Sequence, residues 1–373
     1  MSDIPKWLKE IQKEFGEDVL RTARSLEPRG YRGSGSLSLD IALGGGWGRR
    51  SFARLQGREG SGKTLLFDLA ALEAQLRENK KSIIFDFEGT YDPARFVSLG
   101  GNINMMHIVD HSSVKEAMLF GEAAFDILKS VLVNSDDYAC IGFDSTGAMV
   151  SRAEFEAKME YGQGKATPFY TSRVMADGLK IVNGLIFKCP SEPTVFFVSQ
   201  GRDNIAGASF KGMPPADKQT GGRALPFYAS TIVEVRKGEI VKADVSDDET
   251  GQADRDVEIG HATIAKVKKN KLNGVQNRTA EFMCYTLGGV VGIDRYAELA
   301  SLAIYTKVIK QSGSWFEMSN ESGNIRVQGM AKLVEALRVA ETFHIVDIQT
   351  RATLAKMMDK NAVQADDDES EEQ

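Results

Sequence analysis

The sequence has few cysteines and histidines and no long apolar run, and each shortage excludes a class of protein. Its 373 residues include 3 cysteines and 4 histidines. The cysteines lie far apart and form no Cys-x-x-Cys pair, so neither a disulfide framework nor a zinc knuckle is expected. No stretch approaches the roughly 18 apolar residues of a membrane helix, and the first residues lack the apolar centre of a signal peptide. We therefore expect a cytoplasmic protein with no membrane partner.

An excess of basic charge is also absent, because the formal net charge is −6. Much of this acidity lies at the C-terminus, where residues 366–372 contain six acidic residues and no basic one, so the remainder is near neutral. Such a segment cannot bury apolar surface, and we predict a disordered acidic tail over residues 361–373. Two roles stay open for the tail. It keeps the protein in solution, or it competes with phosphates for a basic groove.

What the sequence does contain is a phosphate-binding motif of the form G-x-x-x-x-G-K-[ST]. It consists of Gly57, Arg58, Glu59, Gly60, Ser61, Gly62, Lys63 and Thr64. An apolar run precedes it and leucines at helical spacing follow, which is the context that the motif requires. Glycines let backbone N–H groups surround an anion at the start of a helix. We therefore predict an ATP site in which Lys63 neutralises the β- and γ-phosphates and the Thr64 hydroxyl binds Mg²⁺.

From Leu37 to about residue 287, apolar strands alternate with helical patterns, which predicts an α/β fold with a wound, mostly parallel sheet. The predicted strands are 52–56, 82–87, 139–143, 195–199, 231–235 and 262–267. Ligands of such sheets bind at the carboxyl ends of the strands, so the polar residues there are candidate site residues.

Three strand ends carry such residues. Glu88 is our candidate general base for an attacking water, with a surface or capping role as the alternative. Asp144 is the expected Mg²⁺ ligand. Gln200 is placed to bond a γ-phosphate and report its loss, and an ordinary loop amide is the alternative.

Two irregular segments, 159–169 and 201–222, follow neighbouring strands. Loops longer than about 12–15 residues tend to be functional or disordered. Basic and apolar side chains are mixed in and beside them, a composition that suits phosphates and unstacked bases, although a disordered lid would look similar. The residues of this kind include Lys165, Phe169, Tyr170, Arg202, Ile205 and Arg223.

Outside this core, residues 7–15 form the pattern of an amphipathic helix, and the Gly/Arg/Ser-rich segment 28–36 has the composition of a linker. The helix either folds back on its own core or docks on a neighbouring subunit. Residues 244–258 predict a hairpin or surface excursion, and residues 288–360 a small additional domain.

Taken in order, these motifs resemble those of the RecA-type homologous recombinases. The resemblance includes GSGSLSLDIALGGG at 33–46, GREGSGKT at 57–64, FDFEGTYDP at 85–93, CIGFDS at 140–145, VSQGR at 198–202, TGGRALPFYAS at 220–230 and KVKKNK at 266–271. It implies a RecA-like P-loop ATPase core at 34–287, an N-terminal polymerisation helix and linker at 1–33, a small C-terminal domain at 288–360 and the tail at 361–373.

The resemblance also implies roles for individual residues. Asp92, together with Arg95 in place of a usual tyrosine, would contact the adenine. Phe227 would couple neighbouring subunits, and Lys269 and Lys271 would enter the ATP site of the adjacent subunit, although a lysine run alone is more often a solvated face. The DNA-binding residues implied are Lys165, Pro168, Phe169, Arg173, Lys180, Arg202, Ile205, Gly221, Gly222 and Arg223.

The function that follows is an ATP-dependent recombinase. Its partners would be single-stranded DNA, homologous double-stranded DNA and further copies of itself in a helical filament. The departures at Arg95, in the second loop and at Pro226 suggest a diverged member, such as a phage-encoded one. Two alternatives stay open: a hexameric helicase or other ring motor built on the same core, and a P-loop kinase of small metabolites.

Overall fold

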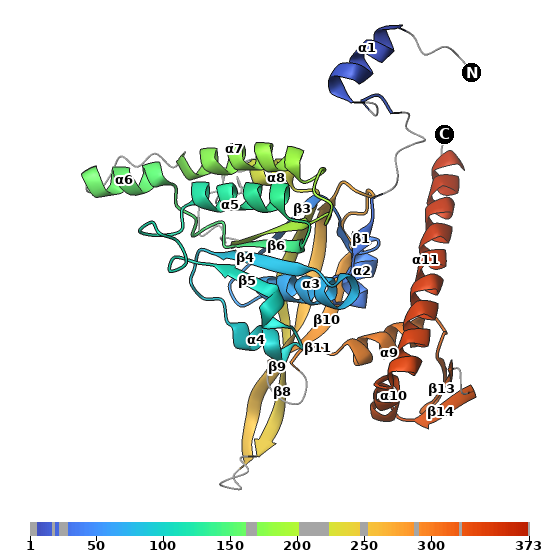
Figure 1. Ribbon diagram of the computed structural model, residues 1–373. Helices are drawn as coiled ribbons and strands as arrows, with labels where there is room; N and C mark the ends of the chain where they lie inside the picture. The colour runs from blue at the N-terminus through green and yellow to red at the C-terminus, as the bar shows by residue number, and fades with distance from the viewer. Residues whose placement is uncertain are drawn as a thin grey trace, which may run out of the picture. The chain divides into compact units, whose positions relative to one another are not determined.

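The computed structural model describes residues 6–16, 19–21, 29–161, 170–200, 224–246, 253–286, 291–320 and 323–371 (Figure 1). The helices are α1 (Lys6–Phe15), α2 (Leu37–Leu43), α3 (Lys63–Glu78), α4 (Pro93–Ser98), α5 (Gly121–Asn134), α6 (Arg152–Tyr161), α7 (Tyr170–Leu185), α8 (Ala224–Tyr228), α9 (Arg295–Tyr305), α10 (Met330–Leu337) and α11 (Ala340–Glu371), with a short 3-10 helix at Ile103–Met105. The strands are β1 (Tyr31–Arg32), β2 (Trp47–Gly48), β3 (Ser51–Gly57), β4 (Lys81–Asp86), β5 (Met106–Val109), β6 (Tyr138–Asp144), β7 (Thr194–Gln200), β8 (Thr231–Ser246), β9 (Ala253–Asn270), β10 (Thr279–Tyr285), β11 (Gly292–Ile293), β12 (Lys310–Ser312), β13 (Trp315–Asn320) and β14 (Gly323–Gln328).

The chain divides after Gly30 into two compact units. The first contains α1, which confirms the helix predicted at 7–15. The second contains every other element named above. Among the described residues, no helix has the length and apolar character needed to cross a bilayer.

A nine-stranded sheet forms the centre of the second unit, in the order β11-β10-β9-β8-β3-β7-β6-β4-β5. The strands from β8 to β5 in this order pair in parallel, and β9, β10 and β11 complete the sheet with antiparallel pairing. The predicted strands all fall in this sheet. The α/β fold with a wound, mostly parallel sheet is therefore confirmed.

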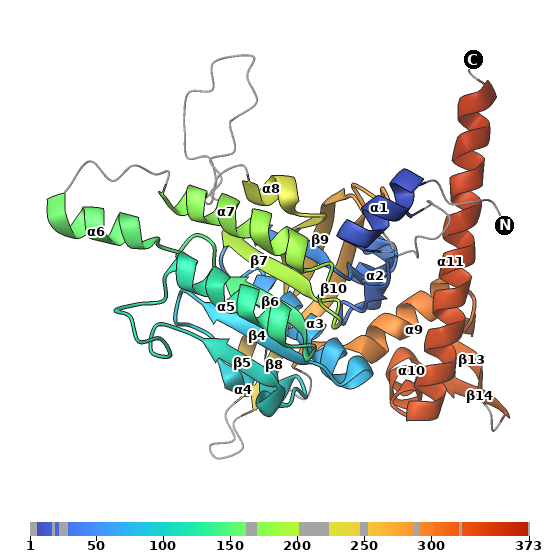
Figure 2. The same cartoon turned by 45° about the horizontal axis from the view of Figure 1, so that its top comes forward.

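Helices cover both faces of the sheet, as the two views in Figures 1 and 2 show. α2 and α3 pack with the sheet in one apolar cluster, and α5 and α7 pack in another. Close packing positions the central strands: the rings of Phe143 and Phe197, on adjacent strands, stack with centroids 4.9 Å apart. On the other face, a methyl group at Gly142 would lie only 2.8 Å from the ring of Phe67 on α3. Glycine at this position thus lets α3 approach β6 closely.

β8 and β9 form a long hairpin that extends beyond the neighbouring strands (Figure 1). Residues 231–235 of β8 pair with β3, whereas the pairing with β9 continues to Ser246 and Ala253. The hairpin predicted for 244–258 is the end of this structure, and residues 247–252 lie outside the described ones.

The C-terminal region has its own apolar cluster, to which α9, α10, α11 and the sheet β12-β13-β14 contribute. The start of α2 is bonded to this region: Glu298 on α9 accepts from the backbone N–H groups of Leu37 and Ser38 at 2.8 and 3.0 Å. Arg351 on α11 donates to the buried Asp40 at 3.0 Å. The boundaries at 287 and 360 stay predictions.

Two sequence expectations differ from the structure. α11 continues to Glu371, past residue 361, where we predicted disorder from charge alone; the segment contains no glycine or proline to end a helix. The linker predicted at 28–36 is wrong for residues 31–36. Residues 31–32 pair with β2, and Ser36 caps α2. Composition was misleading here because a single buried arginine in the segment is held by partners far away in the chain.

That arginine is Arg32, whose side chain is almost fully buried between the sheet and α3. It pairs with Glu78 at 2.8 Å and donates to the carbonyl of Ala139 at 2.8 Å and to the hydroxyl of Thr194 at 3.0 Å. Removing one partner of a buried polar network leaves the others unsatisfied. These bonds join the N-terminal edge of the core to two central strands.

We predict that Arg32→Met lowers the free energy of unfolding by about 3 kcal/mol, because Met replaces the apolar stem of the side chain but bonds neither the carbonyl nor the carboxylate. Urea denaturation followed by circular dichroism measures the change. Arg77→Met is the matched control, since the Arg77–Glu73 pair is exposed and close in sequence. An equal loss in both variants would contradict the prediction.

Candidate active site

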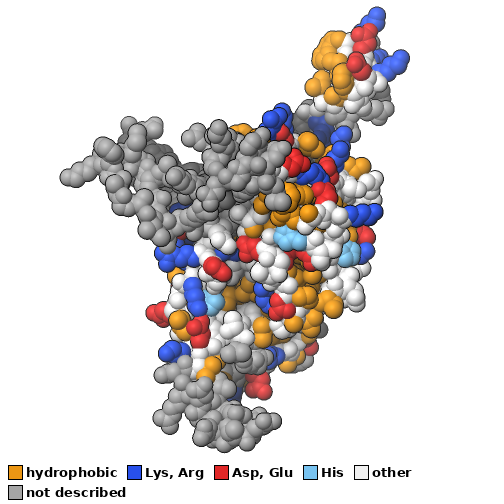
Figure 3. Space-filling model, turned by 90° about the vertical axis from the view of Figure 1, so that its left-hand side faces the viewer, with side chains coloured by type: hydrophobic (Ala, Val, Ile, Leu, Met, Phe, Trp, Pro, Cys, Tyr) orange, Lys and Arg blue, Asp and Glu red, His pale blue; other side chains and the backbone are white. Residues whose placement is uncertain are grey.

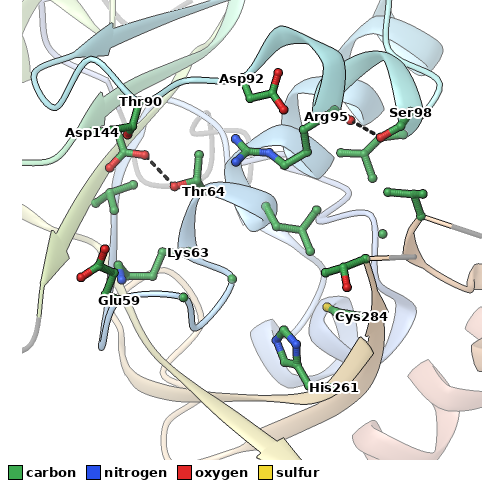
Figure 4. A pocket seen from close by; sticks show the side chains of 18 of the residues that line it. Glu59, Lys63, Thr64, Thr90, Asp92, Arg95, Ser98, Asp144, His261 and Cys284 are labelled. Carbon is green, nitrogen blue, oxygen red and sulfur yellow. Dashed lines mark hydrogen bonds between the residues drawn. The ribbon is translucent and has the colours of Figure 1, made fainter. Parts of the chain in front are cut away.

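Polar strand ends meet at one edge of the sheet. In the register of the parallel strands, Gly57 lies opposite Gln200, and Asp86 lies opposite Asp144. A cavity of about 680 Å³ opens at this edge (Figure 4). Its walls come from the phosphate-binding motif, from the residues after β4, from the ends of β6 and β7, from α4, and from β9, β10 and β11. The predicted site residues that line it are Glu59, Gly60, Gly62, Lys63, Thr64, Glu88, Asp92, Arg95, Asp144 and Gln200.

The loop from Gly57 to Gly62 leads from β3 into α3. Gly60 and Gly62 have φ angles of 68° and 93°, a conformation that only glycine adopts without strain. Lys63 Nζ donates to the carbonyl of Arg58 at 2.6 Å, so the ammonium lies across the loop. Burial lowers the pKa of Lys63, and the carboxylates of Asp144 and Glu88 oppose this shift. An anion bound in the loop would further stabilise the charged lysine.

The remaining predicted members of the motif, Gly57, Arg58 and Ser61, shape the loop and do not line the cavity. A methyl group at Gly57 would lie 2.2 Å from the carbonyl oxygen of Val235, so only glycine fits there. Ser61 is buried, and its hydroxyl has no partner among the described residues. A phosphate oxygen would provide one.

Thr64 and Asp144, the two predicted metal ligands, lie in contact. The Thr64 hydroxyl donates to Asp144 Oδ2 at 2.6 Å (Figure 4). Burial raises the pKa of Asp144, and the negative charges of Glu88 and Asp86 add to the rise, whereas the Thr64 bond opposes it. Mg²⁺ is usually held by one or two carboxylates together with phosphates and water, so this donor pair fits it. Within the described residues, no group of three or more His, Cys, Asp or Glu side chains could hold a metal ion.

Glu88 is held by two neighbours at the strand ends. Ser145, directly after Asp144, donates its hydroxyl to Glu88 Oε1, and Gln200 Nε2 donates to the same oxygen at 3.2 Å. The carboxylate of Asp86 accepts from the backbone N–H groups of Glu88 and Gly89 at 3.1 and 2.9 Å. The structure thus brings together two predicted residues, Glu88 and Gln200, that are 112 positions apart.

Sequence reasoning missed Ser145 and Asp86 as supports of Glu88. Asp86 had a detectable signal, because an aspartate three residues before a glycine is typical of a turn in which the side chain bonds the following backbone. No local pattern could have indicated Ser145, since its partner lies on another strand.

Arg95 and Asp92 lie on the opposite wall, at the start of α4. Asp92 caps this helix by accepting from the Ala94 N–H at 2.9 Å. Arg95 Nε donates to the buried Asp68 at 2.9 Å, and its guanidinium lies over the Tyr91 ring. Burial raises the pKa of Asp68 to about 6, although Arg95 opposes the shift. Arg95 Nη2 has no hydrogen-bond partner among the described residues, so its two N–H groups could donate to a ligand.

The last wall, from β9 to β11, was not predicted as part of the site. It contributes His261, Cys284 and Tyr285, among others (Figure 4). These residues come from antiparallel strands, whose ends have no special relation to the ligand edge of a parallel sheet. The pairing of β8 with β3 and of β9 with β8 brings them to the cavity.

Lys269 and Lys271 do not line this cavity. Lys269 donates to the carbonyl of Pro226, and Lys271 donates to that of Phe227 at 3.1 Å. On the same strand, Thr263 is the residue beside the phosphate loop, 3.8 Å from a methyl group placed at Gly62. Six residues of β-strand separate Thr263 from Lys269, roughly 20 Å. The two lysines therefore lie at the far end of β9 from their own phosphate loop.

Most of the predicted DNA-binding residues, Lys165, Pro168, Phe169, Arg202, Ile205, Gly221, Gly222 and Arg223, lie outside the described residues. Arg173 and Lys180 are described: both are exposed on α7, two helical turns apart and so on one face. Arg173 also lies 3.6 Å from Asp177. On the described part of the face in Figure 3, Lys and Arg side chains are interspersed with Asp and Glu.

Comparison with known proteins identifies the family. The RecA N-terminal domain family matches residues 2–290, which is most of the chain. The chain belongs to the RecA family. It is similar to Protein RecA of Porphyromonas gingivalis, with 34% identity over 82% of this chain and 81% of that protein. Protein RecA of Chlorobium limicola is 36% identical over 85% and 81%, and that of Mycoplasma mycoides is 33% identical over 91% and 88%.

We predict that Asp144→Asn in this RecA-family chain lowers ATP affinity roughly tenfold or more in Mg²⁺, because one anionic ligand of the cation is lost. The amide oxygen still accepts from Thr64, so the fold should persist. Calorimetric titration of ATP, with Mg²⁺ and with EDTA, measures the effect. Asp137→Asn, at an exposed position before β6, is the control. An equal loss in EDTA would contradict a metal role.

Proposed function

We propose that this RecA-family chain is an ATP-dependent DNA recombinase that forms a helical filament on single-stranded DNA and exchanges strands with a homologous duplex. ATP would be hydrolysed between adjacent subunits. One observation carries the proposal. The phosphate loop and the candidate carboxylates share a cavity, whereas the candidate cations Lys269 and Lys271 lie at and just after the end of β9, roughly 20 Å or more from Thr263, the β9 residue beside that loop. A site divided in this way would be complete only where the end of β9 with Lys269 and Lys271 in one subunit meets the cavity of the next subunit. Assembly in the cytoplasm is part of the same proposal.

In the proposed reaction, the loop N–H groups and Lys63 hold the phosphates. Thr64 and Asp144 would hold Mg²⁺, which when bound neutralises phosphate charge. Glu88 orients an attacking water and accepts its proton. Ser145 fixes the Glu88 carboxylate, and this leaves its second oxygen for the water. Arg95 and Asp92 lie where they would contact the base.

Lys269 and Lys271 supply positive charge to the neighbouring site in this scheme. Cations that reach the transferring phosphoryl group stabilise the transition state more than the ground state. Because they come from another subunit, hydrolysis depends on assembly. Their present contacts with the carbonyl oxygens of Pro226 and Phe227 join them to α8, which directly follows the second loop segment.

DNA would be bound through its backbone by the cations of α7 and of residues 162–169 and 201–223. Phosphate contacts position a strand without reading its sequence, so the bases stay free to pair with a homologous duplex. Gln200 lies between Glu88 and the second of these segments. Membership of the RecA family favours this reaction over phosphorylation of a small metabolite.

We predict that Lys269→Met and Glu88→Gln each abolish DNA-stimulated ATP hydrolysis, and that an equal mixture of the two recovers roughly a quarter of wild-type activity. Recovery arises because about one interface in four then joins an intact Glu88 to an intact Lys269. A coupled ATPase assay with single-stranded DNA measures it.

A mixture of Glu88→Gln with Lys63→Ala is the control for this experiment. These two residues belong to the same side of the interface, so no combination of subunits restores a complete site. Full activity of Lys269→Met alone, or equal recovery in both mixtures, would remove the role of Lys269 across the interface.

The pH dependence of hydrolysis gives a second test. Burial lowers the pKa of Lys269 to about 8, and the neighbouring charge of Lys271 contributes. A lowered lysine pKa means that the charge is present below pH 8 and lost as the pH rises through that value. The phosphates of the adjacent site would raise this pKa again. We therefore predict that DNA-stimulated hydrolysis in the wild type falls only at about pH 8 or above, and that this fall is absent in Lys269→Arg, whose guanidinium remains charged. Identical profiles would contradict this.

A further inference from the structure

His261 has a buried ring nitrogen without a partner, in the wall of the candidate nucleotide cavity. The side chain is 7% exposed, and Nε2 has no hydrogen-bond partner among the described residues. Yet His261 lines the cavity, and Figure 4 shows the imidazole on its β9 wall. A buried polar atom without a partner costs free energy, so its presence in a binding cavity indicates a ligand that satisfies it.

The strand register places His261 in the middle of the cavity. On β9, Thr263 lies beside the phosphate loop, and His261 is the next residue on the same face, roughly 7 Å further along. Cys284 of β10 is paired with His261. Beyond them the wall continues with Tyr285, Thr286 and Gly292, and a methyl group at Gly292 would lie 2.3 Å from Leu99, which closes the far end. His261 thus lies between the phosphate end and the closed end.

A nucleotide has the same order of parts, because its ribose joins the phosphates to the base. With the phosphates in the loop at Lys63 and the base between α4 and the ends of β10 and β11, the ribose falls at the level of His261. Thr263 donates its hydroxyl to Cys284 Sγ at 3.2 Å, so that hydroxyl proton is not directed at the imidazole.

The protonation state of His261 suits a hydroxyl partner. Burial lowers the pKa of the imidazole, the positive charge of Lys237 lowers it further, and Glu258 opposes both. Lys237 and Glu258 are themselves paired at 2.6 Å. A neutral imidazole offers one N–H donor and one acceptor nitrogen. Ribose hydroxyls both donate and accept, so they match either tautomer.

Building on the proposed ATP site, we propose that His261 binds the ribose of the nucleotide through a hydrogen bond to Nε2. His261 then discriminates ribonucleotides from nucleotides that lack ribose hydroxyls. It acts in binding and leaves the hydrolytic step unchanged, since the ribose is remote from the γ-phosphate.

Equilibrium titrations of the full chain with three probes test this: ATP, 2′,3′-dideoxy-ATP and inorganic triphosphate, each with Mg²⁺. We expect the wild type to bind ATP roughly tenfold more tightly than dideoxy-ATP, the ratio that one hydrogen bond supplies. In His261→Phe, which keeps a ring but removes both nitrogens, ATP affinity should fall to that of dideoxy-ATP. Triphosphate affinity should not change. 2′-Deoxy- and 3′-deoxy-ATP then show which hydroxyl is bound.

His261→Gln is the rescue variant, because its amide reaches the position of Nε2, and we expect it to restore part of the discrimination. His344→Phe, at an exposed position on α11, is the matched control. In steady-state kinetics His261→Phe should raise KM for ATP and leave kcat unchanged.

Three outcomes would overturn the inference. The first is equal binding of ATP and dideoxy-ATP by the wild type. This result needs no variant, so it counts even if His261→Phe fails to fold. The second is undiminished discrimination in His261→Phe. A wild type that binds triphosphate and ATP equally poorly would instead remove the nucleotide site, and with it the proposed function.

Discussion

The register of four parallel strands is the constraint on which the candidate site depends. β3, β4, β6 and β7 must end at one level for the phosphate loop, Glu88, Asp144 and Gln200 to meet, because each of them lies at or shortly after the end of one of these strands. Apolar packing maintains that register: the rings of Phe143 and Phe197 stack across β6 and β7, and the ring of Phe85 lies 4.7 Å from that of Phe143. A slip of one residue would turn each of these rings to the opposite face of the sheet, out of the apolar cluster that they form with α5 and α7. The chemistry at the edge is therefore stabilised by the interior of the sheet.

In the proposed mechanism, the length of β9 lets one subunit contribute to two sites. Thr263 and His261 lie beside the cavity of their own chain, whereas Lys269 and Lys271 lie at the opposite end of the strand. The pairing of β9 with β8 shifts between Val267 and Lys269, so one residue is left over there. A bulge of this kind redirects the side chains that follow. Val267 is buried, and the residues that follow it at this point are lysines. In the proposed mechanism, the sheet between the two ends of β9 would couple a displacement at one ATP site to the adjacent site.

The sequence could predict those parts of the site that are formed by one continuous segment of the chain. The phosphate loop is a continuous segment with its own glycine requirement, and Glu88, Asp144 and Gln200 each follow a run of buried strand residues. Site residues that depend on contacts between distant segments could not be found this way. Ser145, Asp68 and His261 matter because strands distant in sequence lie next to each other, and no alternation or composition in one segment records that. Arg32 shows the same limit in reverse: its Gly/Arg/Ser-rich surroundings are typical of a linker, but distant carbonyl and carboxylate oxygens make burial favourable.

The contact between Glu88 and Gln200 bears on how strongly nucleotide and DNA can be coupled in the proposed mechanism. The Gln200 amide donates to Oε1 of Glu88, whose carboxylate would hold the attacking water. A γ-phosphate that takes this amide changes the position of the residue immediately before segment 201–223. One exchanged hydrogen bond is worth about 1 kcal/mol, which shifts a two-state equilibrium only about fivefold. A single subunit would therefore be a weak switch. Because each site shares residues with its neighbour, the small bias of each nucleotide would add along a filament, and assembly rather than any individual bond would make the response steep.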